Sequence, residues 1–227
     1  MSEVPGEVRE LYPFLYEGRA ADRDEGVPTE EVVRSAREKT AGIAALRRDI
    51  AAADAGRIAA CATAMAERFA AGGRLFAFGN GGSSTDAQSL ATTFLHPPGG
   101  AAALPALSLT SDAAVVTALS NDVGFDVVFA RQLAAFGRPG DIAVGLSTSG
   151  GSANVVQALE EAARRGLLTV ALAGHHGGRL TQLPSLDNLF IIPSDSVHRI
   201  QEAQTTVYHV LWELIQQALR AGRGGGR

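Results

Sequence analysis

The sequence predicts an α/β protein with a doubly wound parallel sheet of five strands, of the flavodoxin-like type, preceded by two extra N-terminal helices. Short, nearly continuous apolar runs alternate with segments of helical periodicity, which is typical of a parallel sheet that helices cover on both faces. Two Ser/Gly-rich turns each connect an apolar run to a helical segment. Hydrophobic residues make up 46% of the 227 residues, which is enough for a full core.

The N-terminal third is predicted to hold an arm and two helices. Residues 1–28 mix aromatic and charged side chains and are interpreted as an arm, with disorder as the alternative. Thr29, followed by an acidic turn, is typical of a helix start, and helical periodicity continues to about Ala53. Asp54 is expected to cap a second helix, which the glycines at 72–73 end. One sheet does not need both helices, so we expect them to pack on another subunit.

From residue 74 onward the predicted strands and helices alternate. Strands are expected at residues 74–78, 104–109, 142–146, 168–172 and 188–192. Helices are expected at residues 84–95, 112–119, 125–136, 153–165, 179–183 and 199–220. These boundaries predict a single domain over residues 29–221. Its predicted parts are a helical oligomerisation segment at 29–72 and the sheet with its helices at 73–221, with a disordered tail at 222–227.

Charge and composition argue against several classes of partner. The net charge of −4, without a basic stripe, argues against a nucleic-acid surface. The single cysteine, Cys61, excludes an intrachain disulfide and fits a reducing compartment. The sequence has neither an apolar run of membrane-spanning length nor the pattern of a signal peptide. We therefore expect a cytoplasmic protein that binds neither nucleic acid nor membrane.

The two Ser/Gly-rich turns predict a binding site for an anion. They occupy residues 79–84 and 147–152 and follow the first and third predicted strands. Each turn is expected to direct backbone N–H groups, hydroxyl groups and a helix N-terminus toward one point, which suits a phosphate. Neither turn contains Lys or Arg, so neutral donors must provide most of the binding. A single turn of this kind could be an ordinary strand-to-helix connection, but the presence of two favours the anion site.

Four segments carry a resemblance to a known family. In chain order they are residues 79–88, 121–125, 140–155 and 199–209. Together they resemble the signatures of the SIS (sugar isomerase) domain family, in its phosphoheptose isomerase branch, and the similarity extends over about residues 30–220. The resemblance implies sugar phosphate binding and a homotetramer, with the leading helices and the last helix packed between subunits. The branch also includes a non-catalytic relative that associates with the replication initiator.

The resemblance also implies which residues bind the substrate. The serines of the two turns would hold the sugar phosphate, with an asparagine and a threonine nearby: Ser83, Ser147, Ser149 and Ser152, with Asn80 and Thr148. Asp112 matches an acid that accepts hydrogen bonds from sugar hydroxyl groups, and a helix cap is its compatible alternative role. Gln201 matches a glutamine of the family's last helix.

The chain departs from the family at the expected catalytic base. Sedoheptulose 7-phosphate isomerisation requires a base that removes a proton from a carbon next to the carbonyl. The family supplies a His and, four residues later, a Glu, but Ser89 and Thr93 stand at these positions. A hydroxyl group cannot serve as this base at neutral pH. Some members bind zinc through the same residues. With two of four ligand positions lost, we expect neither zinc nor another cofactor.

The last predicted helix keeps a polar stripe formed by Gln201, Thr205 and His209 at a spacing of four residues. His209 is a candidate acid or proton shuttle, with a histidine satisfied at a subunit interface as the alternative. Glu202 is a candidate base, because related SIS isomerases use a glutamate on the corresponding helix. Its structural alternative is an ion pair with Arg199.

Two functions of different classes follow. The first is a phosphosugar aldose–ketose isomerase whose base has shifted. The second is a catalytically silent oligomer that senses a phosphosugar or docks a protein partner through the aromatic segment of the N-terminal arm. The intact phosphate turns with Gln201 and His209 favour the first function. The hydroxyl groups of Ser89 and Thr93 favour the second.

Overall fold

The computed structural model describes residues 29–224. Their contacts divide them into a unit of residues 29–41 and a unit of residues 42–224. The first unit is helical, and Arg34 in it pairs with Glu31 and Glu38. The second unit contains the sheet. The expected arm, residues 1–28, lies outside the described residues, as do residues 225–227.

Five parallel strands form one sheet in the order β2-β1-β3-β4-β5. The strands are β1 (Leu75–Gly79), β2 (Ala106–Ser108), β3 (Ile142–Ser147), β4 (Leu168–Gly174) and β5 (Asn188–Ile192). This order is that of flavodoxin-like folds, and it confirms the predicted doubly wound sheet. In such a sheet the chain reverses its direction of winding between β1 and β3, and ligands bind beyond the carboxyl ends of those strands.

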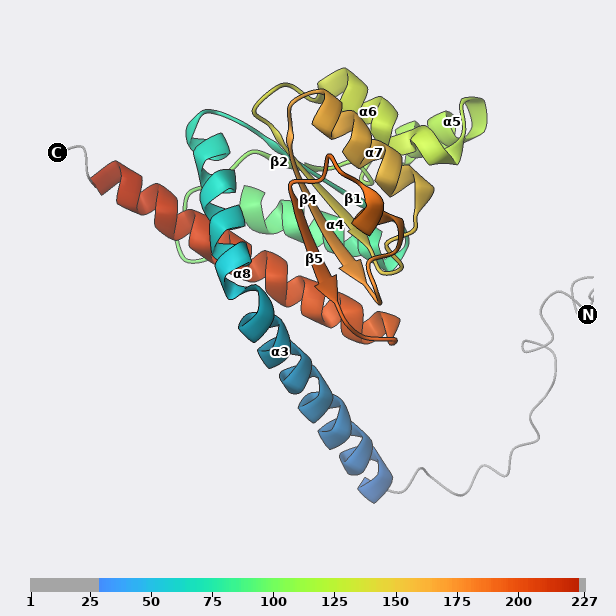
Figure 1. Ribbon diagram of the computed structural model, residues 1–227, viewed down its shortest axis with the longest axis vertical. Coiled ribbons are helices and arrows are strands. Elements are labelled where there is room, and N and C mark those ends of the chain that lie inside the picture. Colours follow the sequence, from blue (N-terminus) through green and yellow to red (C-terminus); the bar gives the residue numbers. More distant parts are fainter. Residues whose placement is uncertain (1–28, 225–227) are drawn as a thin grey trace, which may run out of the picture. The chain divides into compact units, whose positions relative to one another are not determined.

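Helices cover both faces of the sheet (Figure 1). They are α4 (Gly82–Leu95), α5 (Ala113–Asp122), α6 (Val128–Phe136), α7 (Ala153–Arg164) and α8 (Val197–Gly224), with short 3-10 helices η1 (Phe125–Val127) and η2 (Gly178–Gln182). Side chains of β1 alternate between the two faces. Leu75 and Ala77 pack with α4 and α8, whereas Phe76 and Phe78 pack with α6 and α7.

One continuous helix, α3 (Thr29–Ala70), replaces the two leading helices that we expected. Asp54 is buried inside this helix, and its carboxylate accepts a hydrogen bond of 2.6 Å from Arg57 one turn later. Because Arg57 satisfies the carboxylate, Asp54 does not compete for backbone N–H groups as a cap would. The alanines at 51–53 also favour an unbroken helix.

The other elements differ from the expected boundaries by a few residues. The strand expected at 104–109 is limited to β2, and the helix expected at 125–136 divides into η1 and α6. The last helix continues to Gly224, past the expected boundary at 221. No helix within residues 29–224 is long and apolar enough to cross a membrane.

Candidate functional site

The two Ser/Gly-rich turns lie side by side at the carboxyl edge of the sheet. Strands β1 and β3 are neighbours, and Gly79, the first residue of the first turn, pairs with Leu146, which directly precedes the second turn. The first turn leads into α4 and the second into α7. The N-cap residues, Gly81 and Ser152, make no side-chain capping hydrogen bond in the described structure. The N–H groups of Ser83, Ser84 and Val155 already donate to backbone carbonyls of the turns. The N–H groups that a helix N-terminus can direct toward a ligand are therefore those that precede them in each helix.

Two asparagines join the turns. The side-chain amide of Asn80 donates to Asn154 Oδ1 at 2.8 Å, and the amide of Asn154 donates back to Asn80 Oδ1 at 2.9 Å. Asn154 lies in the first turn of α7 and is 2% exposed. This reciprocal pair holds the first turn against the start of α7, which directly follows the second turn. Asn80 therefore has a structural role in addition to its predicted place in the binding site.

The hydroxyl groups of the second turn converge. Ser147 Oγ lies 3.1 Å from Ser152 Oγ and 3.5 Å from Ser149 Oγ. The backbone N–H of Gly151 donates to Ser149 Oγ at 3.2 Å. Thr148 lies between these serines and is half-buried. The structure thus places the hydroxyl groups of Ser149 and Ser152 within hydrogen-bonding distance of Ser147 Oγ.

Ser83 belongs to the first turn and is buried against the end of β1. A Cβ atom on Gly79 would lie 2.8 Å from Ser83 Cβ and 2.8 Å from the carbonyl oxygen of Leu146. Only glycine at position 79 lets the first turn of α4 approach both strands this closely.

The loop after β4 supports the second turn. Gly150 has a φ of 64°, and a Cβ atom there would lie 2.1 Å from the carbonyl oxygen of Gly177. The N–H of Leu180 donates to the carbonyl of Gly150 at 3.1 Å. His175 has the unusual φ of 52°, and its Nδ1 lies 3.5 Å from Asp195 Oδ1. The loop is therefore pressed onto the backbone of the second turn.

Helix α8 contributes Gln201 beside the first turn. A Cβ atom on Gly82 would lie 2.1 Å from Gln201 Nε2, so the amide occupies the space above the first residue of α4. Gln201 Nε2 donates to Asp86 Oδ2 at 3.4 Å. Burial raises the pKa of the half-buried Asp86 carboxyl, and the hydrogen bond from Gln201 offsets part of this effect.

Asp86 is a residue that the sequence analysis did not single out. It lies on α4 on the same helical face as Gly82, Ser89 and Thr93, because these residues are four, three and seven positions away from it and such spacings return to one side of a helix. This shared face is the signal that could have identified it.

Three further candidates lie on α8 and at the start of α5. His209 is exposed, and its Nδ1 donates to the carbonyl of Thr205 at 2.8 Å, which leaves Nε2 for a ligand. Glu202 is exposed and accepts from Arg199 at 2.6 Å. Asp112 is the N-cap of α5 and accepts from the N–H of Val115 at 3.0 Å. The ion pair of Glu202 with Arg199 and the helix cap formed by Asp112 are therefore both present in the structure. The roles of Glu202 as a base and of Asp112 as a sugar ligand stay predictions.

Comparison with known proteins identifies the family. Residues 40–174 match the family model of the SIS domain. The phosphoheptose isomerase of Chlorobaculum tepidum is 44% identical over 184 residues, which is 78% of this chain and 85% of the relative. That of Chlorobium phaeobacteroides is 40% identical over 213 residues, 90% of each chain. The chain belongs to the SIS domain family.

A solved structure extends the comparison to three dimensions. The phosphoheptose isomerase from Neisseria gonorrhoeae matches with a TM-score of 0.76 at 32% identity, covering 82% of this chain and 99% of that one. The phosphoheptose isomerase from Francisella tularensis gives the same TM-score of 0.76 at 32% identity, covering 82% and 98%. Both the predicted SIS fold and the resemblance to the phosphoheptose isomerase branch are confirmed.

The expected loss of zinc concerns residues of α4 and α8. Ser89 and Thr93, the predicted replacements for the His and Glu of the family, lie one turn apart on α4, and Thr93 Oγ1 donates to the carbonyl of Ser89 at 2.9 Å. Of the remaining pair, His209 offers a usual zinc donor and the Gln201 amide a poor one. Within residues 29–224, no three His, Cys, Asp or Glu side chains form a group that could hold a metal ion. The absence of zinc stays a prediction.

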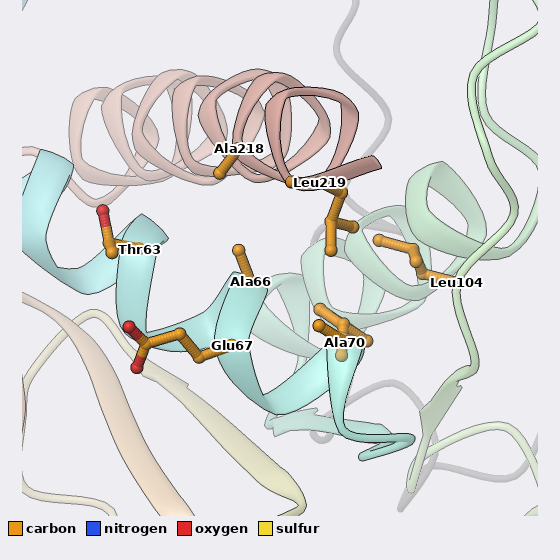
Figure 2. Close-up of a pocket in the computed structure, with 9 residues that line it drawn as sticks. Thr63, Ala66, Glu67, Ala70, Leu104, Ala218 and Leu219 are labelled. Carbon is orange, nitrogen blue, oxygen red and sulfur yellow. The ribbon is translucent and has the colours of Figure 1, made fainter. Parts of the chain in front are cut away.

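A separate groove lies between the C-terminal parts of α3 and α8 (Figure 2). Its volume is about 540 Å³, and Thr63, Ala66, Glu67, Ala218 and Leu219 line it. It shares no residue with the two turns. The proposed anion site of this SIS protein is therefore distinct from the groove.

Proposed function

We propose that this protein binds a phosphosugar, with the phosphate held between the two turns. The observation that carries the proposal is the convergence of the Ser149 and Ser152 hydroxyl groups on Ser147 Oγ, beside two helix N-termini that make no side-chain capping hydrogen bond. The relatives named phosphoheptose isomerase support a heptose phosphate such as sedoheptulose 7-phosphate as the ligand.

Neutral hydrogen-bond donors would stabilise the charge of the phosphate in this site. Hydroxyl and backbone N–H donors bind an anion more strongly than a neutral acceptor, and the helix dipoles add a favourable field. Ser83 and Thr148 would complete the contacts with the phosphate. Asn80 would hold the first turn in place through its hydrogen bonds with Asn154. Gln201, above the start of α4, would contact the sugar, and Asp112 would accept from a sugar hydroxyl while it caps α5.

The first candidate activity is aldose–ketose isomerisation. A base removes a proton from the carbon next to the carbonyl, an enediol forms, and the proton returns to the adjacent carbon. His209 would move protons between the oxygens through Nε2. Glu202 would act as the base, and it must then leave its contact with Arg199.

The second candidate is silent binding, for sensing a phosphosugar or docking a protein partner. It is favoured by the hydroxyl groups at Ser89 and Thr93 and by the contact between Glu202 and Arg199. For both candidates we propose a cytoplasmic homotetramer without zinc, in which the N-terminal arm can contact a partner.

Calorimetric titration with sedoheptulose 7-phosphate tests the binding site. Ser149→Asp places a negative charge among the phosphate donors, and like charges this close cost several kcal/mol, so we expect affinity to fall at least about a hundredfold. Ser149→Ala should lose about tenfold or less. Ser185→Asp, in an exposed loop, is the matched charge control. Equal affinities for Ser149→Asp and the wild type would refute this site.

Deuterium exchange separates the two candidates. An active isomerase incubated with sedoheptulose 7-phosphate in D₂O should introduce deuterium at the carbon next to the carbonyl, as NMR would detect. Glu202→Gln should lower that rate by about a hundredfold or more. Binding without exchange would favour the silent role. Exchange that persists in Glu202→Gln would exclude Glu202 as the base.

A further inference from the structure

We propose that Asp86 is a positioning residue that orients the side-chain amide of Gln201, so that Gln201 Oε1 is presented to a sugar hydroxyl. The inference rests on the phosphosugar binding proposed above and assigns one hydrogen bond to the sugar, in addition to that of Asp112, to a single acceptor atom.

The chemistry of a carboxylate fixes which end of the amide it binds. The ionised carboxylate of Asp86 is only an acceptor, whereas the amide of Gln201 has one donor end and one acceptor end. The end that lies 3.4 Å from Asp86 Oδ2 must therefore be the nitrogen, Nε2. The opposite orientation would set two acceptors against each other. Rotation of the amide is thus coupled to the charge of Asp86.

The packing places this amide at the site. Gly82 lies in the first turn and begins α4, and its missing side chain leaves the space that the Gln201 amide occupies. Helices α4 and α8 lie against each other (Figure 1). The amide therefore lies between the first turn and Asp86, and its remaining polar atom is Oε1.

No other residue of α4 can replace Asp86 in this role, because Asp86 is the only acidic residue of that helix. The groups that face it from α8 are Gln201 and Tyr208, whose phenol pKa is raised by burial and also by the charge of Asp86. Ser89, one turn later on the same face of α4, offers a hydroxyl group that can bond with either end of an amide. Asp86 alone imposes one orientation.

The orientation determines ligand selectivity. A sugar hydroxyl can donate to Oε1, whereas a phosphate dianion has only acceptor oxygens and gains nothing from it. Loss of Asp86 should weaken sugar phosphate binding relative to inorganic phosphate binding, because removal of the carboxylate charge acts on both anions while only the sugar loses a hydrogen bond.

The test is a double-mutant cycle on the full chain, titrated with sedoheptulose 7-phosphate and with inorganic phosphate. Asp86→Asn should weaken sugar phosphate binding by roughly three- to tenfold, the worth of one hydrogen bond. In a Gln201→Met background, Asp86→Asn should change the affinity for sedoheptulose 7-phosphate by less than about twofold, because methionine has no amide for Asp86 to orient. Asp86→Glu should retain part of the affinity, and Glu160→Gln on α7 is the surface control.

Equal losses from Asp86→Asn in both backgrounds, or an equal loss of inorganic phosphate binding, would show a general structural role and overturn the proposal. A second readout does not depend on the ligand. In the free protein, the side-chain amide NMR signal of Gln201 should shift in Asp86→Asn and not in Glu160→Gln. If the wild type binds no sugar phosphate, the proposed function fails, while this signal still tests the orientation of the amide.

Discussion

The asparagine pair shows how single residues order the site. Asn80 and Asn154 each give one donor and one acceptor to the other, so both amides are used within the protein. The sequence places Asn80 in the first turn but does not indicate that Asn154 is its partner. A direct contact between Asn80 and the ligand stays a prediction, whereas its contact with Asn154 is present in the structure.

Replacing Asn154 should therefore weaken both the fold and the site. Asn154→Ala leaves the half-buried amide of Asn80 without its two hydrogen bonds, and we expect the free energy of unfolding to fall by about 1–3 kcal/mol. Urea denaturation would measure this loss. Gln157→Ala, on the same helix, should change stability by less than about 0.5 kcal/mol. Similar values for the two variants would contradict the ordering role of the pair.

At the scale of elements, the start of α4 depends on α8. Gly82 is the first residue of α4, and the side-chain amide of Gln201 fills the space that a side chain at position 82 would occupy. A glycine inside a helix usually lowers helix stability relative to alanine by about 1 kcal/mol. Its presence here is explained by the amide that packs on it.

Gly82→Ala should separate stability from binding. The new Cβ displaces only the flexible end of Gln201, so the melting temperature should stay near that of the wild type while affinity for sedoheptulose 7-phosphate falls by roughly tenfold. Differential scanning fluorimetry and calorimetry would measure the two effects. Gly56→Ala in α3 meets no atom within 4 Å, so it should raise stability and leave affinity unchanged. Unchanged affinity in Gly82→Ala would refute the role of Gln201.

At the scale of the whole molecule, a partly buried ion pair links β1 and β3 at the amino edge of the sheet, the edge opposite the two turns. Asp141 precedes β3, and Arg74 precedes β1; their side chains are joined at 2.7 Å. Burial alone would raise the pKa of Asp141. Hydrogen bonds from the Arg74 side chain, and from the backbone N–H groups of Arg74 and Arg138, outweigh burial and lower it below 3.8.

The lowered pKa predicts how stability depends on acid. Since folding favours the ionised form, the contribution of Asp141 is present above pH 3.8 and is lost as the pH falls from there through the lower pKa of the folded state. Asp141→Asn should thus be clearly less stable than the wild type near pH 6, and the difference should shrink near pH 3. Urea denaturation at both values checks this. A difference that does not depend on pH would contradict the assignment.

The sequence by itself determined the alternation of strands and helices, the doubly wound sheet and the two serine-rich turns. These features are local, because apolar periodicity and turn residues act over a few neighbours. Only the tertiary structure decided that α3 is continuous, that Asn80 bonds with Asn154, and that Gln201 meets Asp86. The last two contacts join residues 74 and 115 positions apart. Such contacts arise when packing brings the carboxyl edge of the sheet against α7 and α8, and no local pattern in the chain specifies them.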